Sequence, residues 1–262
     1  MQQITRAFTW TITILWIVTL LLPMTIAFSI LQLANSNNMG FREPIFSYSN
    51  GNIFLSAPFY INNTGYYDLS DINITIGMRD GDKALARFSG NYPPILAGVL
   101  LNETYDASIS LAQIASKDGE IFVQDKTLNL DGYLFFRIAY LIGIGSSTNH
   151  AIKWGAPFFN LTISPLSFNS STQKLPLTIS FENHAHFAVN GRMQLKMRNS
   201  ESELVETNSK NISAPSGALF FETFELTIDP VTMPAHGVVE VYFDNVKICD
   251  VEVVFEWIVP MP

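Results

Sequence analysis

The chain has 262 residues, of which 48% are hydrophobic, 13% aromatic and 15% charged. This composition excludes an intrinsically disordered chain, which needs high charge and few aromatic residues. The formal net charge is −8 with only 15 Lys and Arg residues. We therefore expect no nucleic-acid partner, because clustered cations are what hold a phosphate backbone. A single cysteine, Cys249, excludes an intramolecular disulfide.

The first element is an apolar segment, Phe8 to Leu33, that contains no charged residue. A helix rises 1.5 Å per residue, so about 20 such residues cross the roughly 30 Å core of a bilayer. We therefore expect a transmembrane anchor over residues 1–34, kinked rather than ended by its proline. The anchor residues that we single out are Phe8, Trp10, Trp16, Leu20, Pro23 and Leu33.

Two processed forms are alternatives to a retained anchor. A cleaved signal peptide has an apolar region of roughly 7–15 residues and a small-x-small cleavage site, whereas this run is longer and offers only a poor site near Ala34. The segment Arg6-Ala7-Phe8-Thr9 resembles the cleavage site of type IV pilin-like precursors. Cleavage after Ala7 would make the apolar helix the core of a filament subunit.

The charges beside the apolar segment predict its orientation. Arg6 precedes the segment, and the first charges after it, Arg42 and Glu43, cancel. We expect a cytoplasmic N-terminus and an extracytoplasmic body at the cell membrane, following the positive-inside rule. Six N-x-[ST] sequons agree with a glycoprotein on the outer side, with acceptors at Asn62, Asn73, Asn102, Asn160, Asn169 and Asn211.

Short alternating segments follow a polar linker over residues 35–50. Ile72, Ile74, Ile76 and Met78 alternate with polar or small residues, as in a half-buried strand. We expect Pro58 to interrupt its strand, at an edge or a bulge. Many short strands separated by Gly, Pro, Asn and Asp clusters predict a mainly β fold of two immunoglobulin-like β-sandwich domains, over residues 51–168 and 172–259.

The segment Tyr133–Gly145 fits two periods. Leu134, Ile138 and Leu141 have helical spacing, while alternate residues from 134 to 144 are also apolar. We expect a helix or a helical corner packed on the first domain.

The two domains share a pattern. Asn63-Thr64-Gly65-Tyr66-Tyr67-Asp68-Leu69 and Asn183-His184-Ala185-His186-Phe187-Ala188-Val189 both lie between two strands. The Asn of each segment can leave the strand ladder, bond nearby backbone and tolerate a left-handed conformation. We therefore expect a duplicated unit of about 100 residues.

This arrangement resembles the LEA-2 (late embryogenesis abundant type 2, or water-stress/hypersensitive-response) domain, in two tandem copies behind a membrane anchor. The resembling residues are Phe59-Tyr60-Ile61-Asn62-Asn63-Thr64-Gly65-Tyr66-Tyr67-Asp68-Leu69 and Ile179-Ser180-Phe181-Glu182-Asn183-His184, which lack the proline that many members carry in this turn. The resemblance implies an immunoglobulin-like sandwich without catalytic residues. It also implies stress protection, lipid binding in the sandwich groove, or interaction at the membrane surface.

The sequence points to no catalytic residue, metal ligand or cofactor. His184, His186 and Glu182 share one face by parity and are a conceivable metal site, but a solvated turn is the simpler interpretation. No Gly-x-Ser-x-Gly nucleophile elbow is present. Asp80-Gly81-Asp82 is typical of a hairpin turn rather than a calcium loop, and Cys249 of a small buried hydrophobe.

We therefore predict a non-enzymatic, single-pass surface protein whose two domains serve adhesion, envelope scaffolding or partner binding. Its partners would be the bilayer and other surface proteins or copies of itself. The alternatives are a binder of lipid or another hydrophobic ligand, with a groove near Tyr133–Gly145, and the pilin-like filament subunit.

Overall fold

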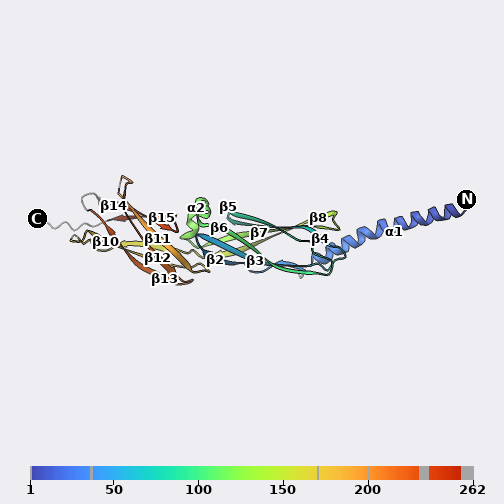
Figure 1. Cartoon of the computed structure of the whole chain (residues 1–262), viewed down its shortest axis with the longest axis horizontal. Helices are drawn as coiled ribbons and strands as arrows, with labels where there is room; N and C mark the ends of the chain where they lie inside the picture. Colours follow the sequence, from blue (N-terminus) through green and yellow to red (C-terminus); the bar gives the residue numbers. More distant parts are fainter. Residues whose placement is uncertain (1, 36–37, 170, 200, 230–235, 255–262) are drawn as a thin grey trace.

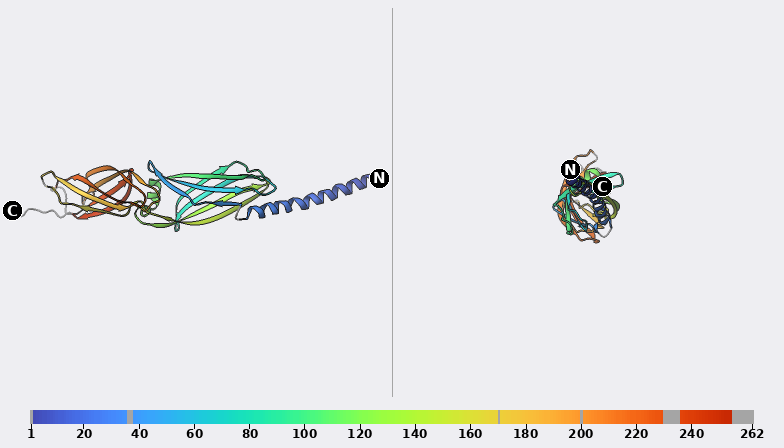
Figure 2. Two further views of the ribbon diagram at one scale, coloured as in Figure 1. Left: turned by 90° about the horizontal axis from the view of Figure 1, so that it is seen from below. Right: turned by 90° about the vertical axis from the view of Figure 1, so that its right-hand side faces the viewer.

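The protein is a rod in which a helix and two β lobes follow one another in line (Figures 1 and 2). The computed structural model describes residues 2–35, 38–169, 171–199, 201–229 and 236–254. The expected outer boundary of the second domain, residue 259, lies outside the described residues. Within them the fold is mainly β with an N-terminal apolar helix, as the sequence predicts.

Helix α1, Gln2–Leu33, continues through Pro23. The hydroxyl of Thr25 donates to the carbonyls of Leu21 (3.0 Å) and Leu22 (2.9 Å), close to the point where the proline lacks an N–H. Thr13 and Thr19 make the same bond to the carbonyl four residues earlier. Each of these hydroxyls is therefore satisfied within the helix, as an apolar surrounding requires.

The first lobe is built from two antiparallel sheets. In one, β3 lies between β6 and the short pair β1 and β2; in the other the order is β5-β4-β7-β8. The strands are β1 (Met39–Phe41), β2 (Ile45–Ser49), β3 (Asn52–Asn62), β4 (Leu69–Asp80), β5 (Lys83–Tyr92), β6 (Leu100–Ser110), β7 (Lys126–Ile138) and β8 (Ile142–Trp154).

The second lobe also has two antiparallel sheets, of order β13-β10-β9 and β12-β11-β14-β15. Its strands are β9 (Phe159–Pro165), β10 (Lys174–Glu182), β11 (Val189–Arg198), β12 (Leu204–Ala214), β13 (Leu219–Thr227), β14 (His236–Phe243) and β15 (Val246–Val254). Strand for strand, this is the order of the first lobe, with β9 in the place of β1 and β2.

Alternating side chains build the core between the sheets of each lobe. In β4, Ile72, Ile74, Ile76 and Met78 are all buried, as the period-2 pattern predicts. Buried residues of both lobes belong to one continuous hydrophobic cluster. The apolar contact therefore does not stop at the boundary between the lobes.

The expected helix or helical corner over Tyr133–Gly145 is wrong. This segment is the end of β7, a tight turn and the start of β8, with Ile138 paired to Ile142. Leu134 and Phe136 point into the core, while Tyr133 is exposed. The local pattern fits both periods, and the neighbouring strands decide for the strand because they supply its hydrogen-bond partners.

Two short helices, α2 (Leu111–Lys117) and the 3₁₀ helix η1 (Gly119–Phe122), lie between β6 and β7. Neither helix is predicted from the sequence. A capping box was the available signal: Ser110 accepts from the N–H of Gln113, whose side chain reaches back to the N–H of Ser110.

Three further expectations differ from the structure. β3 runs unbroken through Pro58, whose carbonyl accepts from Arg42 N (2.8 Å) at the point where β1 ends. The missing N–H of Pro58 therefore faces a gap between β1 and β2. Both of these strands lie in residues 35–50, the segment expected to be a linker. β9, expected in the first domain, pairs with β10 of the second.

Asn63 and Asn183, both fully buried, have the same role in the two lobes. The Asn63 side chain donates to the carbonyls of Tyr67 (2.9 Å) and Ile95 (3.1 Å) and accepts from Gly65 N. The Asn183 amide repeats these bonds with the carbonyls of Phe187 (3.0 Å) and Ala214 (2.8 Å) and with Ala185 N (3.0 Å). As the sequence predicts, each Asn bonds nearby backbone, and each closes the strand-to-strand turn.

We expect Asn183→Ala to lower the free energy of unfolding by about 2–4 kcal/mol, because it leaves two buried carbonyls without a donor. Asn190→Ala is the matched control: Asn190 is exposed, and its loss should change stability by at most about 0.5 kcal/mol. Thermal unfolding of the full chain in detergent measures both. Equal midpoints for the two variants would contradict this role of the buried amide.

Candidate functional site

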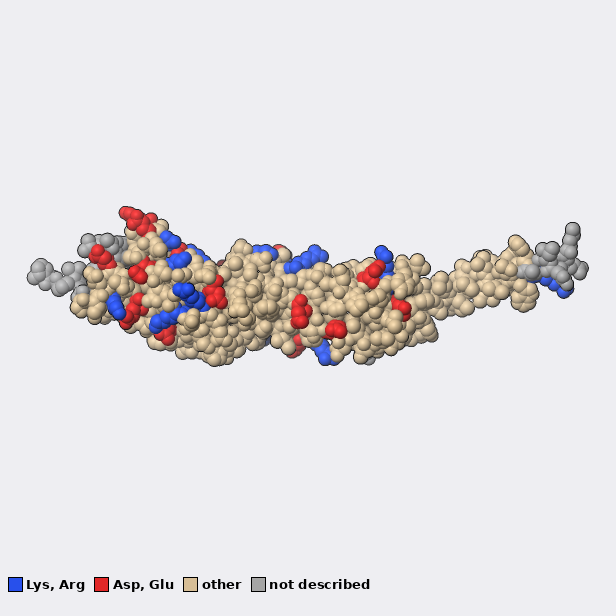
Figure 3. Space-filling view, in the orientation of Figure 1, with Lys and Arg blue, Asp and Glu red and all other residues tan. Residues whose placement is uncertain are grey.

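The described residues contain one helix long and apolar enough to cross a membrane, Phe8–Leu33. From Phe8 to Met24 all its side chains are exposed, with no contact to the lobes that would cover them. Figure 3 shows neither blue nor red along this part of the helix, between Arg6 and the first lobe. So large an exposed hydrocarbon surface requires an apolar surrounding.

The C-terminal end of α1 is docked on the first lobe. Ser29 is buried, and its hydroxyl accepts from Tyr66 N at 3.0 Å. One turn earlier, Thr25 Oγ1 lies 2.7 Å from the hydroxyl of Tyr67. Gly65 permits this approach, because a Cβ at that position would lie 2.9 Å from Cβ of Ser29.

Most of the expected anchor residues lie on the exposed part of the helix: Phe8, Trp10, Trp16, Leu20 and Pro23. Leu33 is different, since it is buried together with Ile26. These two residues and Ser29 form the face that packs on the lobe. Leu33 therefore belongs to the lobe's core, which no hydropathy pattern distinguishes from lipid contact.

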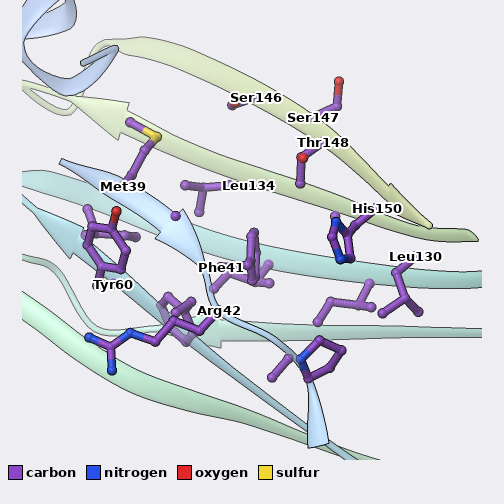
Figure 4. A pocket seen from close by; sticks show the side chains of 18 of the residues that line it. Met39, Phe41, Arg42, Tyr60, Leu130, Leu134, Ser146, Ser147, Thr148 and His150 are labelled. Carbon is purple, nitrogen blue, oxygen red and sulfur yellow. The ribbon is translucent and has the colours of Figure 1, made fainter. Parts of the chain in front are cut away.

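A cavity of about 340 Å³ opens between the two sheets of the first lobe. It lies where β1 and β8, the edge strands of their sheets, do not pair with each other. Phe41 and Leu134 lie between the strands, and Thr148 lines the β8 side, whereas the Ser147 side chain points away (Figure 4). Arg42, Glu43 and His150 also line this mostly apolar cavity, whose mixed lining suits a small amphipathic molecule.

The groove expected near Tyr133–Gly145 thus corresponds in part to this cavity. Gly132 and Leu134 of β7 line it, but its other wall is Met39–Pro44. The sequence predicts a linker for Met39–Pro44. The pairing of β1 with β3 brings them opposite β8.

The lobes meet through a layer of aromatic side chains. The Tyr48 ring lies 6.2 Å from that of Phe187 and 5.5 Å from that of Phe243. Trp154 packs on Phe187 from the other side, with 6.0 Å between ring centroids. These four rings join the cores of the two lobes.

Polar contacts fix the same junction. Tyr48 donates its hydroxyl hydrogen to Asp244, whose other carboxylate oxygen accepts from Arg192 N at 2.8 Å. Burial, and next the bond to Asp244, raise the pKa of Tyr48 well above its ordinary value. A Cβ on Gly155 would lie 1.9 Å from the His184 carbonyl oxygen, so only glycine fits there.

His184, one member of the conceivable metal site, is an ion-pair partner at this junction. Its ring nitrogens lie 2.8 Å from Asp125 and 3.0 Å from Glu182, and the ring stacks on Phe159. Bonds to Asp125 and then to Glu182 raise its pKa above the ordinary 6.5. His186 is exposed, and no group of three metal-ligating side chains converges among the described residues.

The predicted glycosylation acceptors differ in exposure. Asn102, Asn160, Asn169 and Asn211 are exposed. Asn62 and Asn73 are half-buried in strands, and Asn73 donates to Asn91 at 2.8 Å. Four sequons are therefore presented on the surface, by both lobes.

The other residues that we considered for chemistry have structural roles. Asp80 and Lys83 close the β4–β5 hairpin around Gly81, as the sequence predicts. Cys249 is half-buried in β15, and burial raises its pKa to about 11. A thiol with so high a pKa is protonated at neutral pH and is a poor nucleophile.

No protein-family model matches the chain, and no curated protein matches it. Solved structures with a partial likeness include red sea bream transglutaminase (13% identity, 81% of this chain, 31% of that chain, TM-score 0.30). Others are Bacteroides uniformis β-glucuronidase (14%, 80%, 27%, 0.31) and Amycolatopsis orientalis exo-chitosanase CsxA (10%, 81%, 26%, 0.27). The chain spans less than a third of each, and likeness at this level carries no argument about function.

We expect the junction at His184 to make stability depend on pH. Because the folded-state pKa of His184 is raised, its stabilising contribution is complete below pH 6.5 and is lost as pH rises through the folded-state value. As the pH is raised from 6 to 8, the thermal midpoint should therefore decrease, and it should decrease more in the wild type than in His184→Gln. The exposed neighbour provides the control, His186→Gln, which should retain the wild-type slope; equal slopes for all three proteins would refute the assignment.

Proposed function

We propose that the protein is a non-enzymatic, single-pass membrane protein that holds two β-sandwich lobes away from the membrane for adhesion, scaffolding or partner binding. The observation that carries this proposal is the division of α1 into two parts. Phe8–Met24 is apolar and uncovered, whereas the end of the helix is built into the first lobe. A retained anchor explains both parts.

Two junctions support a stiff stalk. α1 is tied to the turn before β4 by Ser29 and Thr25. The lobes are tied to each other by the rings around Tyr48 and by the carboxylate of Asp244. A rod with such joints displays its C-terminal lobe at a set distance from the membrane, which suits contact with another surface.

The cell-membrane location with a cytoplasmic N-terminus is part of the proposal. Arg6 precedes the span, and the exposed sequons are distributed over both lobes. Glycosylation of the exposed acceptors requires the body to be extracytoplasmic. Strand β8, which pairs on one side with β7, offers an edge for self-assembly or partner pairing.

We also propose that the lobes are two copies of one LEA-2-like unit. The equal strand order supports this, and so do the matching bonds of Asn63 and Asn183. A second correspondence lies in the β5–β6 and β12–β13 connections, where Gly98 and Gly217 both have positive φ and both donate to the carbonyl of the buried Asn. Chance convergence rarely repeats both the buried side-chain bonds and the backbone bonds.

We expect the full chain to stay in the membrane fraction after carbonate washing.

On intact cells, a membrane-impermeant maleimide should label Asn211→Cys in a Cys249→Ser background, because residue 211 is exposed on the second lobe. Labelling only after lysis would refute the orientation.

A mature N-terminus at Met1 or Gln2, read by mass spectrometry, would exclude the pilin-like cleavage after Ala7.

The cavity of the first lobe favours a second candidate function, binding of a lipid or another amphipathic ligand. Its volume of about 340 Å³ lies at the lower end of the range of ligand pockets, about 300–1,000 Å³. It opens at β8 beside Ser146 and Thr148. An acyl chain fits the apolar interior, and the hydroxyls suit a polar end group.

We expect native mass spectrometry of the full chain, released from detergent micelles, to retain a bound amphiphile. Thr148→Trp should abolish this adduct, because Thr148 faces Phe41 across the cavity opening and the indole fills it. Ser108→Trp is a matched control, since Ser108 is also an exposed strand residue with a hydroxyl side chain but lies outside the cavity lining. The absence of an adduct on the wild type, or equal adducts on both variants, would exclude the cavity as a binding site.

A further inference from the structure

Exposed apolar side chains surround the place where α1 joins the first lobe. They lie in three connections, β3–β4, β5–β6 and β7–β8, or at the first strand residue after them, at this end of the lobe (Figure 1). Each is at least 40% exposed. We call this group the apolar collar; its members are Tyr66, Leu96, Val99, Leu100, Tyr140, Leu141 and Ile142.

Backbone contacts hold the three connections together at the helix end. Leu69, the first residue of β4, pairs with Ile95 of one connection and with Ile138 beside another. Asn63 N donates to the carbonyl of Val99 at 3.0 Å. Through Tyr66, whose N–H donates to Ser29, the same cluster reaches α1. The collar therefore lies next to the apolar helix and continues its surface.

The length of the free helix brings this end of the lobe to the bilayer surface. The lobe covers one face of α1 from Ile26 to Leu33. The uncovered stretch Phe8–Met24 measures on the order of 25 Å at 1.5 Å per residue. This is slightly less than the roughly 30 Å core of a bilayer, so no free helix remains to hold the lobe away from the headgroups.

The side chains of the β7–β8 turn are not those that its backbone conformation favours. Ala139 and Tyr140 have φ values of 52° and 59°, a region that favours Gly, Asn and Asp. The corresponding turn of the second lobe has Asp244 and Asn245, with φ values of 46° and 66°. That turn packs on the first lobe and has the residues that the conformation prefers. The first lobe instead places a tyrosine and Leu141 there, both exposed.

We propose that the apolar collar is a second membrane contact, which inserts into the interfacial layer of the bilayer that α1 crosses. Tyr66 and Tyr140 suit this depth, because their rings are apolar and their hydroxyls can reach the headgroups. Of the nearby charges, Arg137 and Asp71 pair with each other at 3.2 Å, and Asp68 accepts from Ala97 N at 2.9 Å. With helix and collar both in the bilayer, the rod is fixed in its tilt. This inference rests on the proposed membrane anchor.

The test uses the full chain in phosphatidylcholine vesicles with and without doxyl-labelled phosphatidylcholine. Single cysteines, in a Cys249→Ser background, carry an environment-sensitive nitrobenzoxadiazole fluorophore. Leu141→Cys and Leu96→Cys probe two connections of the collar. Leu15→Cys reports the span, and Asn245→Cys is the matched control in the exposed position of the second lobe's turn.

We expect the doxyl lipid to quench the two collar probes and the probe at residue 15 several-fold more than the probe at residue 245. If the probe at residue 15 is quenched but the collar probes are quenched no more than the probe at residue 245, the collar proposal is overturned and the anchor proposal is retained. Failure of quenching at all four positions overturns the anchor and the collar together.

A second variant separates membrane contact from folding. Tyr140→Asn gives the turn a residue that its positive φ favours, and Leu141→Ser replaces an exposed leucine, so the thermal midpoint should not fall. The probe at Leu96→Cys should nevertheless become less quenched, because one of the three connections has lost its apolar side chains. Unchanged quenching at residue 96 would show that the β7–β8 turn does not contribute to the contact.

Discussion

The exposed hydrocarbon of α1 has to be removed from water, and this constraint organises the whole molecule. Apolar area costs about 25 cal/mol per Å² when it is exposed to water, so a bare helix of this length is not stable in solution. The structure removes one part of this surface by packing Ile26, Ser29 and Leu33 on the first lobe. The remainder, Phe8–Met24, stays exposed, and the proposed anchor places it in a bilayer. The proposed position of the first lobe at the membrane rests on this division.

The same end of each lobe is used to attach it to what precedes it. In the first lobe, the turn after Asn63 receives α1 through Tyr66 and Tyr67. In the second lobe, the corresponding turn, with Phe187, receives the first lobe through Tyr48. A buried asparagine amide holds each turn closed. Two lobes with the same strand order are thus attached at the same end, one to a helix and the other to a preceding lobe, through different side chains of the turn.

Local sequence was sufficient where one residue pattern has one physical solution. The uncharged run of α1 and the alternation in β4 predict a membrane helix and half-buried strands. The two buried asparagines were also recognisable from their neighbours, because their bonds are made mostly to nearby backbone. The segment Tyr133–Gly145 failed this condition. Its apolar residues suit a helix as well as a strand, and only pairing with β4 distinguishes the two.

The sequence by itself determined the long apolar helix, the mainly β character and the Asn-containing turns of the two halves, since all of these depend on contacts between residues close in the chain. Tertiary structure alone decided that Leu33 is a core residue, that Met39–Pro44 forms a cavity wall opposite β8, and that His184 binds Asp125. It also gathered the apolar collar from three separate connections. In each case the partners are far apart in sequence, and their approach depends on strand register, which no local pattern specifies.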